Sequence, residues 1–246
     1  MTNRQYFSYD WRRVDNACFS RKSGKDCLAL HEAAHMLFTE RFFPNSNPRY
    51  HYMESDGGMP FAEVERDETR HEDIRFLLQI LMAGDLAVYM NLGGYEPQDF
   101  ATYCYVAENA VRASDWKNVR HLLCGKTDDQ TISLLQLMAC HTAMYLEDNW
   151  RPLMKEWHIM RTFIDGFTYL PSLMRYLDDP KTAAKLMGGT YDPAETAALK
   201  ARLVSPETCH DTCLLLGRMY NSGAFRDRCV AALHVEAQAQ PDDLHH

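Results

Sequence analysis

The chain contains little glycine and proline, with 12 Gly and 10 Pro among 246 residues. This scarcity excludes collagen-like and low-complexity chains, and a hydrophobic content of 46% indicates a folded core. Positive charge is also scarce, because 26 Lys and Arg stand against 34 Asp and Glu and leave a net charge of −8. We therefore expect no nucleic acid among its partners.

Long hydrophobic runs and export signals are missing as well. The first residues show no apolar core of a secretory signal peptide, so we expect no export. The most apolar stretch, residues 76–95, carries Gln79, Asp85 and three glycines, so we expect no membrane partner. Eight cysteines without an export signal are typical of reduced thiols, and the sequence thus predicts a cytoplasmic protein.

Apolar residues recur at spacings of three and four along most of the chain, which predicts a mostly α fold. We expect an N-terminal arm over residues 1–25, a main domain over 26–165 and a C-terminal helical extension over 166–246. Short alternating runs around Gly57-Gly58 predict one small β-ribbon within residues 50–65. The expected helices cover residues 26–42, 68–92, 98–112, 116–123, 128–146 and 150–163, with shorter helices beyond Gly166.

His31-Glu32-Ala33-Ala34-His35 is an HExxH sequence within the helix expected over residues 26–42. Residues four apart lie on the same face of a helix, so both imidazoles can bind one cation. Glu32 lies one step round the helix, where its carboxylate can take a proton from a water that the metal activates. The motif therefore predicts zinc as cofactor and metal-assisted hydrolysis as chemistry.

The alternative is a helix that contains two histidines without any metal role. Its apolar neighbours argue against this, because Leu28, Leu30 and Leu37 predict that the segment is buried. Two imidazoles and a carboxylate without partners would be costly in such surroundings. The sequence therefore favours metal binding.

A catalytic zinc ion usually has three protein ligands, so a third ligand must come from another segment. The candidates are acids and histidines on helices that can pack against residues 26–42: Asp85, Asp99, Glu108, His121 and His141. Asp99 lies at the start of a helix, where an aspartate can equally serve as an N-terminal cap. Glu108 lies about 180° further round that helix and would point the other way. The residues alone leave the choice open.

The segment Leu28–Phe38 resembles the zinc helix of the FtsH-type peptidases, the proteolytic domain of membrane-anchored AAA+ proteases. The resemblance implies a zincin-like helical fold with His31 and His35 as zinc ligands and Glu32 as general base. It covers about residues 26–160, and includes the expected ribbon and residues 81–87, which are similar to the family's Gly-Arg-Ala-Ala-Glu helix. Residues 98–101 resemble its Asn-Asp-Leu segment, which implies Asp99 as the third ligand.

The sequence departs from this family at several positions. Ala34 stands where the family usually has Gly, Asp85 where it has Arg, and Gln98 where it has Asn. The family couples its peptidase to an ATPase, but residues 125–127 (Gly-Lys-Thr) lack the upstream glycine of a Walker loop and have Arg120 in its place. We therefore expect no ATP-driven unfolding by this chain, and a peptide or an unfolded protein as substrate.

Two further patterns have structural explanations. Cys209 and Cys213, with Cys229 and His234 further on, offer ligands for a second, structural zinc site. The first two are also one helical turn apart, and buried free thiols are common, so we favour thiols in a core. The Met and aromatic stripe over residues 138–163 predicts packing in the core or in a homo-oligomer, not a cofactor site.

The sequence therefore predicts a zinc-dependent metallopeptidase that hydrolyses peptide bonds without ATP. One alternative is a non-catalytic regulatory or scaffold protein that contains zinc and retains the peptidase fold. Another is a metal hydrolase that acts on a non-peptide amide. The metal content and the hydrolysis of an unfolded protein distinguish the first two, and a panel of other substrates would reveal the third.

Overall fold

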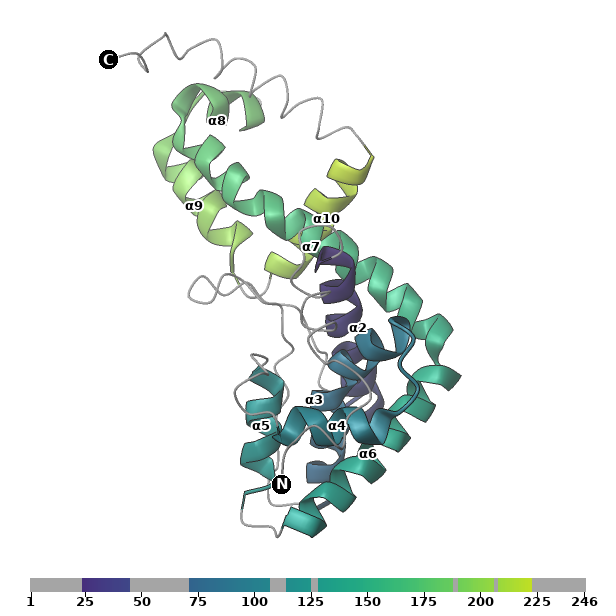
Figure 1. The fold of residues 1–246 in the computed structure, drawn as a ribbon. Coiled ribbons are helices and arrows are strands. Elements are labelled where there is room, and N and C mark those ends of the chain that lie inside the picture. The colour runs from purple at the N-terminus through teal and green to yellow at the C-terminus, as the bar shows by residue number, and fades with distance from the viewer. Residues whose placement is uncertain are drawn as a thin grey trace, which may run out of the picture. The chain divides into compact units, whose positions relative to one another are not determined.

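A computed structural model of the chain describes residues 24–44, 71–106, 114–124, 128–187, 190–205 and 208–222. Every regular element in these ranges is a helix, which confirms the mostly α prediction (Figure 1). The expected β-ribbon and nearly all of the expected N-terminal arm lie outside the described residues. The helices are α2 (Gly24–Phe42), α3 (His71–Asn91), α4 (Pro97–Val106), α5 (Ser114–Leu122), α6 (Asp128–Asp148), α7 (Trp150–Asp178), α8 (Pro180–Met187), α9 (Pro193–Leu203) and α10 (Cys209–Asn221).

The chain divides into two compact units, and the division falls within α7. Of the helices, the first unit contains α2 to α6 and the beginning of α7 up to Arg161. The second unit contains the remainder of α7 from Thr162, together with α8, α9 and α10. The boundary expected after residue 165 lies in this same helix.

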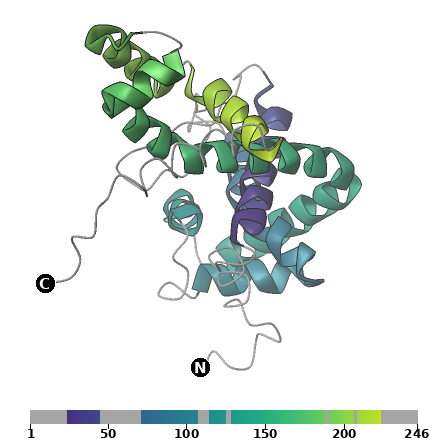
Figure 2. The ribbon, with the colours of Figure 1, turned by 90° about the horizontal axis from the view of Figure 1, so that it is seen from above.

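α2 and α3 lie side by side in the first unit (Figures 1 and 2). Ala29, Ala33 and Ala34 of α2 are completely buried, and such small side chains let a neighbouring helix approach closely. Phe42 of α2 stacks on Phe76 of α3 with ring centroids 4.4 Å apart. The HExxH segment therefore lies in a core, as its apolar neighbours predict.

Other helices cover α3 on several sides, since α2, α5 and α6 all pack against it. By length and composition alone its segment Ile74–Asn91 is apolar enough to cross a membrane, but 67% of that segment is buried within the protein. A core helix meets the same criteria. In the turn after α3, Gly93 has a φ of 86°, a left-handed conformation that glycine adopts without strain.

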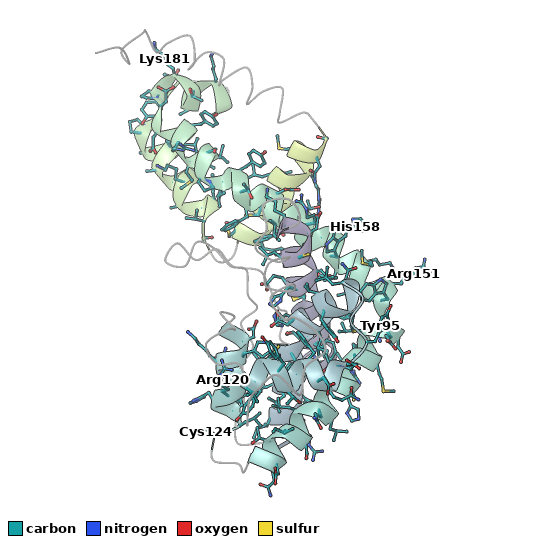
Figure 3. All side chains as sticks on the ribbon, in the orientation of Figure 1. Tyr95, Arg120, Cys124, Arg151, His158 and Lys181 are labelled. Carbon is teal, nitrogen blue, oxygen red and sulfur yellow. The ribbon has the colours of Figure 1, made fainter. Side chains whose placement is uncertain are left out.

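Aromatic and polar contacts fix α4 and α5 against the first unit's core. The ring of Phe100 in α4 stacks on that of Tyr89 in α3, with centroids 4.4 Å apart. It also contacts the ring of Trp116 in α5 edge-on, with centroids 6.4 Å apart. Arg120 of α5, labelled in Figure 3, donates hydrogen bonds of 3.2 Å to two carbonyl oxygens in the last turn of α4. A cation at this end also interacts favourably with the helix dipole. The start of α5 is thereby held in a defined position.

The helix α7 is longer than the sequence predicts. The sequence predicts a helix that ends at residue 163 and shorter helices beyond Gly166, but α7 continues through Gly166 and Pro171 to Asp178. Proline removes one helical hydrogen bond, and burial of apolar side chains on either side of it offsets that cost. These buried side chains are Phe163, Leu170 and Leu177.

Two glycines let α7 and α10 pack with their backbones in direct contact within the second unit. A Cβ atom on Gly166 would lie 1.7 Å from the carbonyl oxygen of Cys213, and one on Gly217 would lie 2.0 Å from that of Thr162. Both distances are far shorter than a van der Waals contact. No side chain therefore fits at either position without separating the helices.

Cys209 and Cys213 form a pair of buried thiols on α10, with their Sγ atoms 4.0 Å apart. Their hydrogen bond, together with burial, raises the pKa of the Cys213 thiol well above its usual range, so this thiol stays protonated. In the described part of the chain no third metal-ligand residue joins them, and Cys229 and His234 lie outside that part. This environment supports buried thiols, the interpretation that the sequence favours.

We predict that Gly217→Ala lowers the free energy of unfolding by about 1–3 kcal/mol, because the added methyl group overlaps the α7 backbone. Thermal unfolding followed by circular dichroism measures this loss. Leu215→Ala is the matched control, since Leu215 lies on the same helix with 58% of its surface exposed. Equal stability of the two variants would contradict the close packing of α7 and α10.

Candidate metal centre

The helix α2 is held near both of its ends within the first unit. Near its start, Trp157 donates a hydrogen bond of 2.9 Å to the carbonyl oxygen of Asp26, and Arg161 pairs with the Asp26 carboxylate at 2.7 Å. Near its end, the ring of Phe38 packs edge-on against that of Tyr145 in α6, with ring centroids 4.9 Å apart. The helix therefore presents its HExxH residues from a fixed position.

His31 and His35 point to one shared position beside α2. Their Nε2 atoms are 2.9 Å apart, and their rings are nearly perpendicular, at 81°. Glu32 lies between them in the chain and is 7% exposed, and His31 is 8% exposed. The sequence prediction that these two histidines face one position agrees with this geometry.

Asp115, in the first turn of α5, supplies a third atom to this position. Its Oδ2 lies 3.2 Å from His31 Nε2 and 3.5 Å from His35 Nε2. Ligand atoms around a tetrahedral zinc ion, bonded at about 2.0 Å, are separated by about 3.3 Å. The three separations of 2.9, 3.2 and 3.5 Å bracket that value, so these atoms fit one face of a zinc coordination shell.

The hydrogen bonds on the far side of each ring determine which nitrogen carries the proton. His35 Nδ1 is 2.7 Å from the carbonyl oxygen of Ile80, which can only accept, so Nδ1 is the donor. His31 Nδ1 is 3.1 Å from Oδ1 of Asp85, a carboxylate that is 3% exposed. When both rings are neutral with their protons on Nδ1, each directs its Nε2 lone pair at the other, whereas a proton on His31 Nε2 would be donated to Asp115. Two such lone pairs repel unless a proton or a cation lies between them.

The electrostatics of the cluster also favour a cation. Burial raises the pKa of the Asp115 carboxyl, but the adjacent His35 and His31 outweigh it and bring that pKa well below its usual range. Asp115 is therefore ionised. Burial lowers the pKa of His31, yet its hydrogen bonds with Asp115 and Asp85 more than reverse this and leave the pKa well above its usual value. The acids here thus stabilise positive charge at the imidazoles.

The pKa of Glu32 shifts in the opposite direction to that of Asp115. Burial raises the pKa of the Glu32 carboxyl, although the nearby His31 and His35 oppose that change. A higher pKa makes a carboxylate a better proton acceptor near neutral pH. The environment of Glu32 is thus compatible with general-base chemistry.

The helix α3 reaches the His31 ring at a glycine. A Cβ atom built on Gly84 would lie 2.7 Å from three atoms of that ring, Cε1, Cγ and Nδ1. Because real Cβ atoms do not approach ring atoms so closely, His31 keeps its position only while residue 84 has no side chain. Gly84 is therefore part of the support of the site.

The structure does not bring Asp99 to the two histidines. Asp99 lies in the first turn of α4 and is exposed, whereas the next residue, Phe100, is buried. Among the described residues, the group of potential metal ligands consists of His31, His35 and Asp115. Of the other candidates for the third ligand, Asp85 contacts the far nitrogen of His31, His121 and His141 are exposed, and Glu108 lies outside the described residues.

Sequence analysis missed Asp115 because its local pattern is not distinctive. Gln98-Asp99-Phe100 and Ser114-Asp115-Trp116 share the order of a polar residue, an aspartate and a bulky aromatic residue, and each lies at the start of a helix. In the sequence, Ser114-Asp115 falls in the gap between the helices expected over residues 98–112 and 116–123. The shared pattern would have placed both aspartates among the candidates, but would not have chosen between them.

No protein-family model, curated protein or solved structure matches this chain. What the site can do therefore has to be inferred from its own residues.

We predict that Asp115→Asn weakens zinc binding by more than about 100-fold, because a lost ligand costs more than the 10–100-fold typical of a lost outer hydrogen bond. Competition with a chromophoric chelator measures the affinity. Asp99→Asn is the matched control and should bind zinc like the wild type. The opposite ranking would identify Asp99 as the ligand.

Gly84→Ala should also weaken zinc binding, and it should lower the melting temperature of the metal-free protein. At a solvent-exposed position within a helix, Gly→Ala stabilises the folded protein by up to about 1 kcal/mol. A decrease in stability at residue 84 would therefore report the collision of the new methyl group with His31. Differential scanning calorimetry and zinc titration measure the two effects. A more stable variant with unchanged affinity would show that the ring does not depend on Gly84.

Proposed function

We propose that this protein is a zinc-dependent metallopeptidase with a zincin-like helical domain of the FtsH type. In this proposal His31, His35 and Asp115 hold the zinc ion, and Glu32 is the general base. The observation that carries it is the convergence of three ligand atoms, all within 4.8 Å of one another, beside the glutamate of an HExxH motif.

The donor set suits zinc. Two imidazole nitrogens and one carboxylate oxygen form a common catalytic combination, which leaves a coordination position for water or substrate. When bound, zinc polarises a substrate carbonyl and lowers the pKa of water to about 7. The aspartate brings one full negative charge, so the site retains part of the positive charge of the metal.

The chain's own residues supply the remaining steps. Glu32 takes a proton from the attacking water and later delivers it to the leaving amine, a role for which its raised pKa is suited. Ile80 and Asp85 hold the protons of His35 and His31 on Nδ1, so that both Nε2 atoms stay available as ligands. The burial of His31 and Glu32 limits the access of bulk water.

We propose a peptide or an unfolded protein as substrate, and the cytoplasm as location. A folded protein would first have to be unfolded, and we expect no ATP-driven unfolding by this chain.

We predict that Glu32→Gln abolishes the hydrolysis of an unfolded, fluorescently labelled protein but leaves about one zinc ion bound per chain. Glutamine keeps the size of the side chain and loses the proton acceptor, so the rate should fall by at least about 100-fold. Glu40→Gln is the control, since Glu40 is exposed on the same helix.

Each outcome of this experiment has a distinct meaning. Unchanged hydrolysis by Glu32→Gln would refute its role as base. Bound zinc without cleavage of any unfolded protein by the wild type would favour the regulatory or scaffold alternative. Cleavage of small amides alone would favour a non-peptide hydrolase.

A further inference from the structure

Asp85 is a buried carboxylate at the centre of the site's support. It lies on α3 directly after Gly84, the residue that gives room to the His31 ring, and only 3% of its surface is exposed. A buried ionised group is costly unless hydrogen bonds compensate for the lost water. In Asp85 both carboxylate oxygens have such a partner.

The first partner is His31. Asp85 Oδ1 lies 3.1 Å from Nδ1, the nitrogen on the far side of the ring from Asp115 and His35. A carboxylate at this point accepts the Nδ1 proton and keeps the Nε2 lone pair free for a cation. Asp85 thus selects the tautomer of His31 that can bind metal.

The second partner is Trp116, the neighbour of Asp115. Trp116 is completely buried, and its indole Nε1 donates a hydrogen bond of 2.6 Å to Oδ2 of Asp85. This bond fixes the first turn of α5, the turn that carries Asp115. Through Trp116, the same carboxylate therefore also determines where the third ligand lies.

We infer that Asp85 is a positioning residue that aligns two of the three zinc ligands, His31 directly and Asp115 through Trp116. The inference rests on the proposed function only in that the cluster binds a metal. In this inference, one side chain brings together His31 of α2 and Asp115 of α5, two ligands that are 84 residues apart in the chain.

Asp85→Asn tests the inference by replacing one carboxylate oxygen with an NH2 group, which donates hydrogen bonds and accepts none. If the NH2 group faces His31, the ring has to place its own proton on Nε2, where it blocks the metal. If the NH2 group faces Trp116, two donors meet and α5 shifts. Either way we expect zinc and cobalt affinity to fall by about 10–100-fold.

The control for burial is Asp165→Asn, because Asp165 is also a buried aspartate on a helix but belongs to the second unit. It should bind zinc like the wild type. Trp116→Phe keeps the Asp85 contact with His31 and removes only the bond to α5, so its loss of affinity should be smaller.

The decisive measurement compares the zinc affinity of Asp85→Asn, of Trp116→Phe and of the double variant that carries both substitutions. If Trp116 acts through Asp85, the double variant should bind zinc no more weakly than Asp85→Asn alone, so the losses of affinity should not add. The absorption bands of the cobalt-loaded protein should change in Asp85→Asn but not in Asp165→Asn. A merely structural effect on stability would leave the cobalt spectrum unchanged.

The failure of this inference can be told apart from the failure of the proposed function. Zinc affinity of Asp85→Asn within twofold of the wild type, or additive effects in the double variant, would overturn the inference alone. A wild-type protein that binds neither zinc nor cobalt would overturn both. Should Asp85→Asn not fold, unchanged affinity and spectrum in Trp116→Phe would overturn the inference.

Discussion

Two imidazole nitrogens held 2.9 Å apart, the Nε2 atoms of His31 and His35, are the constraint on which the rest of the site depends. The carbonyl oxygen of Ile80 and the carboxylate of Asp85 hold a proton on each Nδ1, so when the rings are neutral their two Nε2 lone pairs face each other. Such an arrangement is unfavourable by itself and becomes favourable around a cation. The ionised Asp115, within 3.5 Å of both nitrogens, adds the negative charge that a divalent metal requires.

The helix α3 makes this arrangement feasible in a protein core. Ile80 and Gly84 are four residues apart and therefore lie on one face of the helix. From that face the first supplies a hydrogen-bond acceptor to His35, and the second leaves room for the His31 ring. Asp85 follows directly and binds both His31 and Trp116. One stretch of a buried helix thus satisfies the outer nitrogens of both histidines, which would otherwise be costly to bury.

Much of the fold follows from local patterns. Helical spacing located α2, α3, α5 and α6 to within a few residues of where the described parts of the chain place them, because each buries an apolar face of adjacent turns. It also located the start of α4, whose expected end at residue 112 lies outside the described residues. The prediction of a helix end at residue 163 was wrong, because α7 continues through Gly166 and Pro171. Their local cost is real, but buried contacts before and after them exceed it, and such contacts are not visible in a short window of sequence.

The sequence by itself determined that His31, Glu32 and His35 lie together, because the repeat of a single helix fixes their relative positions whatever the rest of the chain does. Only the tertiary structure decided which carboxylate lies beside them. Asp99 and Asp115 follow the same local pattern, but Asp99 is exposed, whereas Asp115 lies 3.2 Å from Nε2 of His31, next to Trp116, whose indole donates a hydrogen bond to Asp85. A contact across 84 residues depends on how separate helices pack, and no local spacing encodes that.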